Sequence, residues 1–388
     1  MSDGLNNAAQ WIIEQLRFDR AGPEALTSDP VDWNQVIAVA QREGLVGMLL
    51  ASDVADSMPP TVYRQLDEIR FQTRSYNARR RLELENWLDR FDASGISTIV
   101  LKGVALTALV YERSALRPMS DVDVLVRRED FDRAGDLLRA DGFLPHREVT
   151  RSDERALRTQ VGWVRQEPPN DSLDLHWHLV DSGYYARHVP IQWFWDHTIN
   201  VPFGKRDMRV FTPEAQLLHM AAHFELHHAG RNLLGLYDVA ALLHKFGDAM
   251  DWDLALDTAK RFEWGESLRA AVERAQMTFN VAVSDSVNAR LASLRATRRE
   301  RLARVLAEPD AHQAAFLFDG LDQGDWRRRM RYLGRSLFPA AEFMRVHGPI
   351  RNRRDLAWQY ILRLGRGMYR IPRALWAGVT QLWKGGVL

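Results

Sequence analysis

Residues 117–126 read RPMSDVDVLV and carry the pattern that decides the fold. The three valines of this stretch alternate with Asp121, Asp123 and Leu125, as in a β-strand whose side chains point in turn to opposite faces. Both carboxylates therefore emerge on one face while the valines enter the core. Two adjacent carboxylates suit Mg²⁺, which proteins bind through one or two carboxylates together with substrate phosphates. Without a cation the pair is unfavourable, because like charges close together resist joint ionisation.

A predicted strand-to-helix turn precedes this stretch. Residues 95–101 read GISTIVL, a β-branched run typical of a strand, and residues 104–112 favour a helix. Lys102 and Gly103 lie between them. A glycine at this point lets backbone N–H groups and the helix N-terminus approach a phosphate, and Lys102 adds a positive charge.

A second polar strand is predicted further along the chain. Residues 173–179 read LDLHWHL and alternate strictly, so that Asp174, His176 and His178 share one face. The sequence thus predicts a third carboxylate on another strand. The two histidines would either touch substrate or support the residues that hold the metal.

The glycine turn, the Asp-x-Asp strand and the later strand aspartate together resemble the polymerase beta-type nucleotidyltransferase superfamily. The closest resemblance is to an uncharacterised bacterial nucleotidyltransferase family whose members carry Leu-Lys-Gly, Asp-x-Asp and Leu-His-Trp motifs. The likeness extends to residues 33–50, 217–243 and 337–339.

The resemblance implies an α/β (α+β) fold with a small mixed-sheet core and extensive helical domains on both sides of it. We predict four segments from this likeness and from the apolar spacing. They are an N-terminal helical region (1–92), the nucleotidyltransferase core (93–211), a C-terminal helical domain (212–320) and a basic, aromatic-rich helical tail (321–388).

The resemblance also implies metal-dependent transfer of a nucleoside monophosphate from a nucleoside triphosphate, such as ATP, to an unknown hydroxyl or phosphate acceptor. Asp121 and Asp123 would bind Mg²⁺ or Mn²⁺, and Asp174 would be a third ligand or the general base. Four residues of the two turns beside the strands would contact the nucleotide: Lys102, Gly103, Arg117 and Ser120.

Two alternatives stay open. Leu-Lys-Gly before Asp-x-Asp also resembles abortive-infection nucleotidyltransferases, which are toxin-like enzymes acting on RNA. Val104 stands where the superfamily usually has Gly or Ser, and 17 residues separate Gly103 from Asp121, more than is common. These departures favour a catalytically silent binding module at a membrane-associated biosynthetic assembly.

Three further histidines form a loose helical stripe. His219, His223 and His227 are spaced four residues apart, but the glutamate of the His-Glu-x-x-His metalloprotease motif is missing. We expect His223 and Asp238 to hold the helical domain against the sheet or to line an acceptor pocket, rather than to bind a transition metal.

Composition limits the class of protein. The chain has 388 residues, of which 46% are hydrophobic and 27% charged, as in a globular protein of two or three domains. The absence of cysteine excludes disulfides, thiolate zinc sites and a cysteine nucleophile. We find no secretory signal and no apolar run long enough to span a bilayer, so we expect a cytoplasmic location, either free or peripheral at the inner face of the membrane.

The net charge of +1 conceals a strong asymmetry. Residues 326–388 contain 14 Lys and Arg but two acids, and tryptophans and tyrosines are interleaved with the arginines. Such a segment suits packing against the acidic remainder of the chain, an anionic membrane surface, or nucleic acid.

Overall fold

The structure is a computed structural model. It describes residues 3–19, 31–111, 115–119, 121–145, 159–165, 172–180, 182–308, 325–338, 344, 352–362, 365, 376 and 380. Ser120 and much of the basic tail therefore lie outside the described residues. In the described ranges no helix combines the length and the apolarity needed to cross a bilayer.

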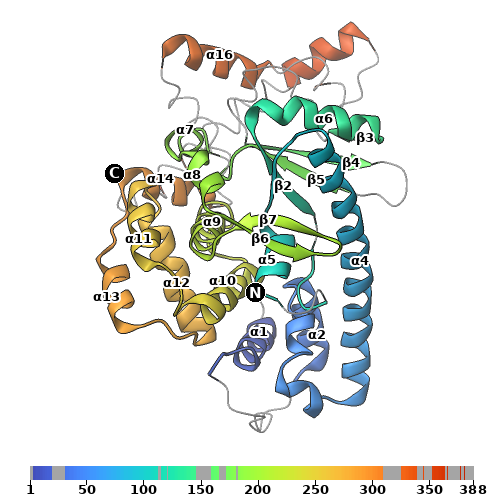
Figure 1. The fold of residues 1–388 in the computed structure, drawn as a ribbon, viewed down its shortest axis with the longest axis vertical. Coiled ribbons are helices and arrows are strands. Elements are labelled where there is room, and N and C mark those ends of the chain that lie inside the picture. The colour runs from blue at the N-terminus through green and yellow to red at the C-terminus, as the bar shows by residue number, and fades with distance from the viewer. Residues whose placement is uncertain are drawn as a thin grey trace.

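The N-terminal region is helical, as the sequence predicts. Its elements are α1 (Asp3–Gln15), α2 (Trp33–Arg42), α3 (Val46–Leu49), η1 (Asp53–Ser57) and α4 (Pro60–Ala93). The apolar spacing of residues 33–51 alone predicts one helix, but the chain divides at Gly44, whose φ of +72° is left-handed and ends α2. Figure 1 shows α4 running along one side of the molecule, past the first helices and past the sheet.

A five-stranded mixed sheet forms the core, and it confirms the predicted α+β class. Its strands are β1 (Thr98–Val100), β2 (Val122–Val126), β3 (Phe143–Pro145), β4 (Gln160–Arg165) and β5 (Ser172–His176), in the order β1-β2-β5-β4-β3. Only the pair β2 and β5 is parallel; the other pairs are antiparallel. Helices α5 (Lys102–Leu109) and α6 (Phe131–Ala140, after the short η2, Arg128–Asp130) connect the strands.

The segment after β5 is more regular than the sequence indicates. The sequence of residues 190–209 alone indicates mostly irregular chain or short strand, but these residues contain a helix and most of a tight β-hairpin. After β5 the elements are α7 (Tyr185–His188), α8 (Ile191–Asp196), β6 (Thr198–Phe203) and β7 (Arg206–Phe211). Gly204, with a φ of +63°, starts the two-residue turn between β6 and β7.

The helices of residues 213–307 lie on the opposite side of the molecule from α4, whereas α16 lies at the top of the view (Figure 1). Thr212 and Pro213 are a typical helix start in the sequence, and the structure agrees, with Thr212 as N-cap and Pro213 in the first turn; the Thr212 hydroxyl accepts from the Ala215 amide. The helices are α9 (Pro213–Leu226), α10 (Leu233–Phe246), α11 (Trp252–Arg261), α12 (Gly265–Phe279), α13 (Asp285–Ser293), α14 (Arg298–Ala307) and α16 (Trp326–Leu337).

Two apolar clusters lie on the two faces of the sheet. Val122, Val124, Leu173 and Leu175 belong to the cluster that α4, α5 and α6 share. The opposite face of β2, with Leu125, joins a larger cluster built from the N-terminal helices and α9–α12. Asp123 lies on the same face of β2 as Leu125. Its side chain therefore points toward the C-terminal helices.

Candidate active site

The parallel pairing of β2 with β5 brings the two strand aspartates together. The register sets Asp123 directly opposite Asp174, so their side chains leave the same face of the sheet. Asp123 is buried and Asp174 is half-buried. Asp121 lies just before β2 and is also half-buried. The structure thus brings Asp123 and Asp174 together, and Asp121 is near enough for its charge to raise the pKa of Asp174.

One oxygen of Asp123 has two partners from the chain itself. Oδ1 accepts a hydrogen bond from Lys102 Nζ at 2.6 Å and lies 2.8 Å from His176 Nε2. Burial alone would raise the pKa of the Asp123 carboxyl, but the Lys102 ammonium and the His176 hydrogen bond outweigh it and hold the pKa well below its usual value. Asp123 is therefore ionised at neutral pH.

Lys102 reaches Asp123 from the start of α5. Its backbone φ of 48° is left-handed, which is uncommon for a residue other than glycine and is often found at functional sites. Burial would lower the pKa of its ammonium, but the charge of Asp123 raises the pKa above the ordinary lysine value. The next residue must be small, because a Cβ at Gly103 would lie 2.5 Å from Arg117 Nη1.

Asp174 differs from Asp123 in its environment. Its Oδ2 accepts from Gln160 Nε2 at 3.1 Å, on the neighbouring strand β4. Burial, and then the negative charges of Asp123 and Asp121, raise the pKa of the Asp174 carboxyl above its usual value. The pKa values of the two facing carboxyls are thus shifted in opposite directions, as in enzyme sites where one carboxylate stays ionised and the other exchanges a proton.

The donor set fits a divalent cation. Asp123, Asp174 and His176 each offer one ligand atom, and these atoms all lie within 4.8 Å of one another. Carboxylate oxygens suit Mg²⁺, and a nitrogen among them is compatible with Mn²⁺. Three carboxylates with Lys102 beside them leave an excess of negative charge that a bound cation would offset.

Arg117 is part of a buried ion pair. Its Nε lies 2.9 Å from Asp238 Oδ1, and its Nη2 lies 2.8 Å from Asp238 Oδ2. The Tyr111 hydroxyl donates to the same carboxylate at 2.6 Å. Asp238 thereby links the segment before β2 to α10. The predicted phosphate contact of Arg117 stays a prediction.

The predicted histidines occupy different environments. β5 ends at His176, so His178 lies past the strand, and its Nε2 is 3.0 Å from the carbonyl of Val189. Burial lowers the pKa of His178 to about 4. His223 lies on α9, where burial, and then the charge of Lys102, keep its pKa well below the usual value. Ser120 lies outside the described residues.

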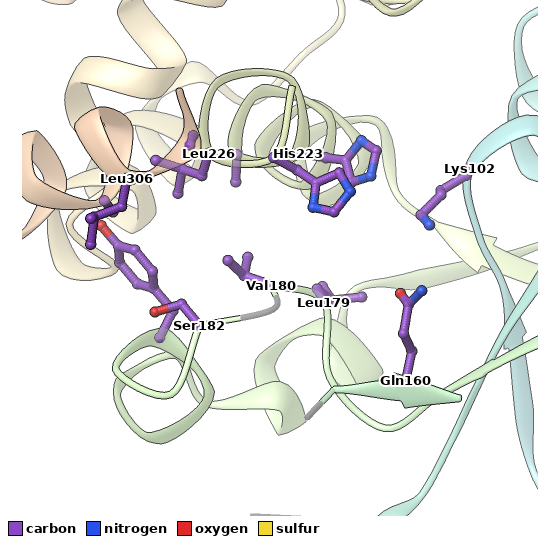
Figure 2. Close-up of a pocket in the computed structure, with 13 residues that line it drawn as sticks. Lys102, Gln160, Leu179, Val180, Ser182, His223, Leu226 and Leu306 are labelled. Carbon is purple, nitrogen blue, oxygen red and sulfur yellow. The ribbon is translucent and has the colours of Figure 1, made fainter. Parts of the chain in front are cut away.

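A cavity of about 170 Å³ begins beside the carboxylates. Lys102 and Gln160 line one end, and Leu226 and Leu306 line the other, with His223 between them (Figure 2). The cavity therefore leads from the carboxylates, along α9, to an apolar end formed by helices. His223 lines this cavity; that the cavity takes an acceptor stays a prediction.

Residues 29–280 match the family described as uncharacterised nucleotidyltransferase. The chain belongs to this family. The match covers the sheet, the three carboxylates and helices α2 to α12, so it confirms the resemblance drawn from the Leu-Lys-Gly, Asp-x-Asp and Leu-His-Trp motifs.

No curated protein matches the chain. Among solved structures, the chain is similar to an antigenic nucleotidyltransferase-like protein from Paracoccidioides brasiliensis. The sequence identity is 13% and the TM-score is 0.33, over 60% of this chain and 96% of that chain.

The structure adds residues to the site of this nucleotidyltransferase family member that the sequence did not single out. Gln160 contacts Asp174, and Tyr185 lines the cavity. His228 lies beside His223 and His227. Neither glutamine nor tyrosine stands out in a sequence without a pairing register, but the His227-His228 pair was visible as a dipeptide.

Proposed function

We propose that the protein transfers a nucleoside monophosphate from a nucleoside triphosphate to an acceptor hydroxyl or phosphate. The observation that carries this proposal is the pairing of Asp123 with Asp174 in register on parallel strands, with Lys102 in contact with Asp123. Membership of the nucleotidyltransferase family supports it.

Asp121, Asp123 and Asp174 would hold one or two Mg²⁺ or Mn²⁺ ions. When bound, these ions neutralise the triphosphate and stabilise the entering and leaving oxygens. Lys102 and the Gly103 turn would contact the phosphates, since Lys102 Nζ can exchange its carboxylate partner for a phosphate oxygen when a cation takes its place.

The transfer forms a bond between the acceptor oxygen and the α-phosphorus and breaks the bond from that phosphorus to the bridging oxygen of the β-phosphate. Pyrophosphate leaves. Asp174 would either complete the metal site or take the proton of an acceptor hydroxyl, since it faces Asp123 in register on the neighbouring strand. His176 would hold Asp123 in orientation through the 2.8 Å contact.

The acceptor would lie in the cavity that starts at Lys102 and Gln160. Its volume of about 170 Å³ fits a small molecule or the end of a larger one. The apolar lining of its far end, with Leu226 and Leu306, favours an acceptor that has an apolar part next to its reacting oxygen.

A labelled triphosphate tests the proposal. The protein would be incubated with each of four triphosphates carrying ³²P at the α-position, with Mg²⁺ or Mn²⁺ and a pool of small hydroxylated molecules, and pyrophosphate release would be followed. We expect label transfer that Asp174→Asn reduces by at least about a hundredfold, in line with general-base removal. The matched control is Asp207→Asn, an exposed aspartate of β7, which should transfer label normally.

One observation favours a second function, that of a catalytically silent binding module. Asp123 already has a cationic and an imidazole partner on a single oxygen, so the chain can satisfy this carboxylate without a metal. In that case triphosphate would bind, but neither pyrophosphate release nor label transfer would follow with any acceptor.

A further inference from the structure

Three imidazoles gather at the end of α9. His223 lies in the last turn of the helix, His227 caps it and His228 follows. The amides of both His227 and His228 donate to the carbonyl of His223, at 3.1 and 3.3 Å. This shared acceptor explains why two consecutive side chains return to the same place beside His223.

The chain then turns sharply away. Ala229 has a φ of +50° and Gly230 a φ of +67°, and the Gly230 amide donates to the Phe224 carbonyl at 2.9 Å. A left-handed alanine is unfavourable for an L-residue. The backbone therefore holds the last turn of α9, with its histidines, in a defined conformation.

The ring geometry is convergent. The ring centroids are 5.0 Å apart for His223 and His227, 4.7 Å for His223 and His228, and 5.0 Å for His227 and His228. One nitrogen from each ring lies within 4.8 Å of the other two. Zinc bound by imidazoles at about 2.1 Å in a tetrahedron separates its nitrogens by roughly 3.4 Å, so small side-chain rotations bring the three into range.

Hydrogen bonds do not account for two of the three imidazoles. Within the described part of the chain, the side chains of His223 and His228 donate and accept no hydrogen bond. His178, His188 and His197 differ in this respect, because each contacts a backbone carbonyl. His223 and His228 thus keep ring nitrogens available that other histidines of this protein use for hydrogen bonds to the backbone.

The cluster also borders the cavity. His223 and His227 line it together with Lys102 and Gln160 (Figure 2). Zinc sites that react or bind ligands have three protein ligands and an open fourth position, whereas closed sites have four. A metal held here would present its open position to whatever molecule occupies the cavity.

We propose that His223, His227 and His228 bind one transition-metal ion of the Zn²⁺ class, with a fourth position open to the cavity. This site is separate from the carboxylates of β2 and β5, and the proposal does not rest on nucleotidyl transfer. The open position would take a water or an oxygen of the molecule bound in the cavity.

Metal titration of the full chain tests this. The protein, free of any polyhistidine tag and stripped with a chelator, would be titrated with ZnCl₂ by calorimetry and with CoCl₂ by visible absorption. We expect one Zn²⁺ per chain at the histidines, in addition to any ion held by Asp123, Asp174 and His176, and the intense absorption bands of tetrahedral Co²⁺. His227→Gln and His228→Gln should each weaken Zn²⁺ binding by at least about tenfold and remove these bands.

Two control variants locate the ion. Asp123→Asn should keep the Zn²⁺ ion that His227→Gln loses, together with the tetrahedral Co²⁺ bands, and so should His188→Gln, an exposed histidine outside the cluster. Loss of Zn²⁺ in Asp123→Asn with normal binding in His227→Gln would assign the ion to Asp123, Asp174 and His176 and overturn the proposal. Binding weaker than about 10 µM in the wild type would also overturn it. Thermal unfolding without metal checks that each variant is folded.

Discussion

Lys102 supplies the positive charge that Asp123 needs when no metal is bound. Its Nζ contacts Asp123 Oδ1 at 2.6 Å, and Lys102 is the first residue of α5, where a phosphate is expected. Under the proposed function, a metal ion would compete with Lys102 for the same carboxylate oxygen. A bound triphosphate would relieve this competition, because its phosphates would give Lys102 a new partner.

Lys102→Met should separate these two effects. Without the competing ammonium, we expect Mn²⁺ in the absence of nucleotide to bind several-fold more tightly than in the wild type. The affinity for the triphosphate should fall about tenfold or more, because a phosphate contact is lost. Electron paramagnetic resonance measures free Mn²⁺ in both proteins.

The control for this change is Lys205→Met, at an exposed lysine in the turn between β6 and β7. It should leave both affinities unchanged. If Lys102→Met bound Mn²⁺ no better than the wild type and bound nucleotide equally well, Lys102 would be a structural partner of Asp123 alone.

His219 should make the stability of the protein sensitive to acid. It is buried on α9, neither ring nitrogen has a hydrogen-bond partner in the described part of the chain, and burial lowers its pKa to about 3. An unfolded histidine titrates near about 6.5. Between these values the unfolded chain binds more protons, so stability falls as the pH falls from about 6.5 toward 3.

His219→Leu removes this contribution. We expect the free energy of unfolding to vary less between pH 6.5 and pH 4 than in the wild type, with equal or greater stability at pH 7 because an unpaired polar ring is lost. Urea denaturation at several pH values measures this. His188→Gln, at an exposed histidine, should keep the wild-type slope; an unchanged slope in His219→Leu would refute the assignment.

The sequence predicts those residues of the site that lie on strands in which polar and apolar side chains alternate. The period of two fixes which face Asp123 and Asp174 share, and the register of β2 and β5 agrees with it. Gln160 could not be predicted, because its partner depends on how β4 pairs with β5. The Arg117–Asp238 pair joins positions 121 residues apart, and neither residue type indicates its partner.

The long helix α4 holds the starts of both site strands. It is polar overall, yet it buries Asn77 and Arg80. Asn77 Nδ2 donates to the Arg117 carbonyl at 2.8 Å, just before β2, and Arg80 Nη1 donates to the Ser172 carbonyl at 3.1 Å, at the start of β5. Buried polar groups of α4 thus fix the strands whose register aligns the aspartates.

The Arg117–Asp238 pair links elements in the same way, between the approach to β2 and α10. Arg117→Met would leave Asp238 buried with Tyr111 as its remaining partner in this cluster. We expect a loss of about 3–5 kcal/mol in the free energy of unfolding, measured in urea. The double variant Arg117→Met/Asp238→Leu should recover most of it, because no unpaired charge remains.

The same variants test whether Arg117 also contacts phosphate. If the double variant is stable and binds triphosphate as the wild type does, Arg117 links elements only. If Arg117→Met unfolds as the wild type does but binds triphosphate weakly, the ion pair contributes little and Arg117 is a nucleotide ligand, as the sequence predicts.

At the element scale, prediction from sequence succeeds where the periodicity is strong and the ends are marked. The N-cap Thr212 with Pro213 begins α9 as expected, and the valine alternation gives β2. It fails for the hairpin of β6 and β7, where Pro202 and Asn200 weaken the strand pattern. Pairing with a neighbouring strand stabilises this segment, and a single-sequence pattern does not contain that pairing.

At the scale of the whole molecule, the site lies where the two apolar clusters meet. The sheet contributes the carboxylates, and the C-terminal helices close the far side of the cavity through Leu226 and Leu306. Neither part forms the site alone. Helical residues before β1 and after β7 share one cluster, so the fold brings the N-terminal helices and helices α9 to α13 together around the sheet.

The basic tail is the part of the molecule with the strongest charge. We expect deletion of residues 371–388 to weaken sedimentation with vesicles that contain anionic lipid, if this segment contacts a membrane surface. Sedimentation would be compared at two salt concentrations, with neutral vesicles as control. Unchanged sedimentation would leave packing against the acidic part of the chain, or nucleic acid, as the role of the tail.

The central claim is that Asp123 belongs to a metal-dependent nucleotide site, and thermal unfolding tests it most directly. The wild type and Asp123→Asn would be heated with each of four triphosphates, with and without Mg²⁺ or Mn²⁺. A ligand at 100 times its Kd stabilises the folded state by about 2.7 kcal/mol. We predict a shift in Tm that needs both metal and triphosphate and is absent from a folded Asp123→Asn. A shift of equal size in both proteins, or none with any triphosphate, would contradict the claim.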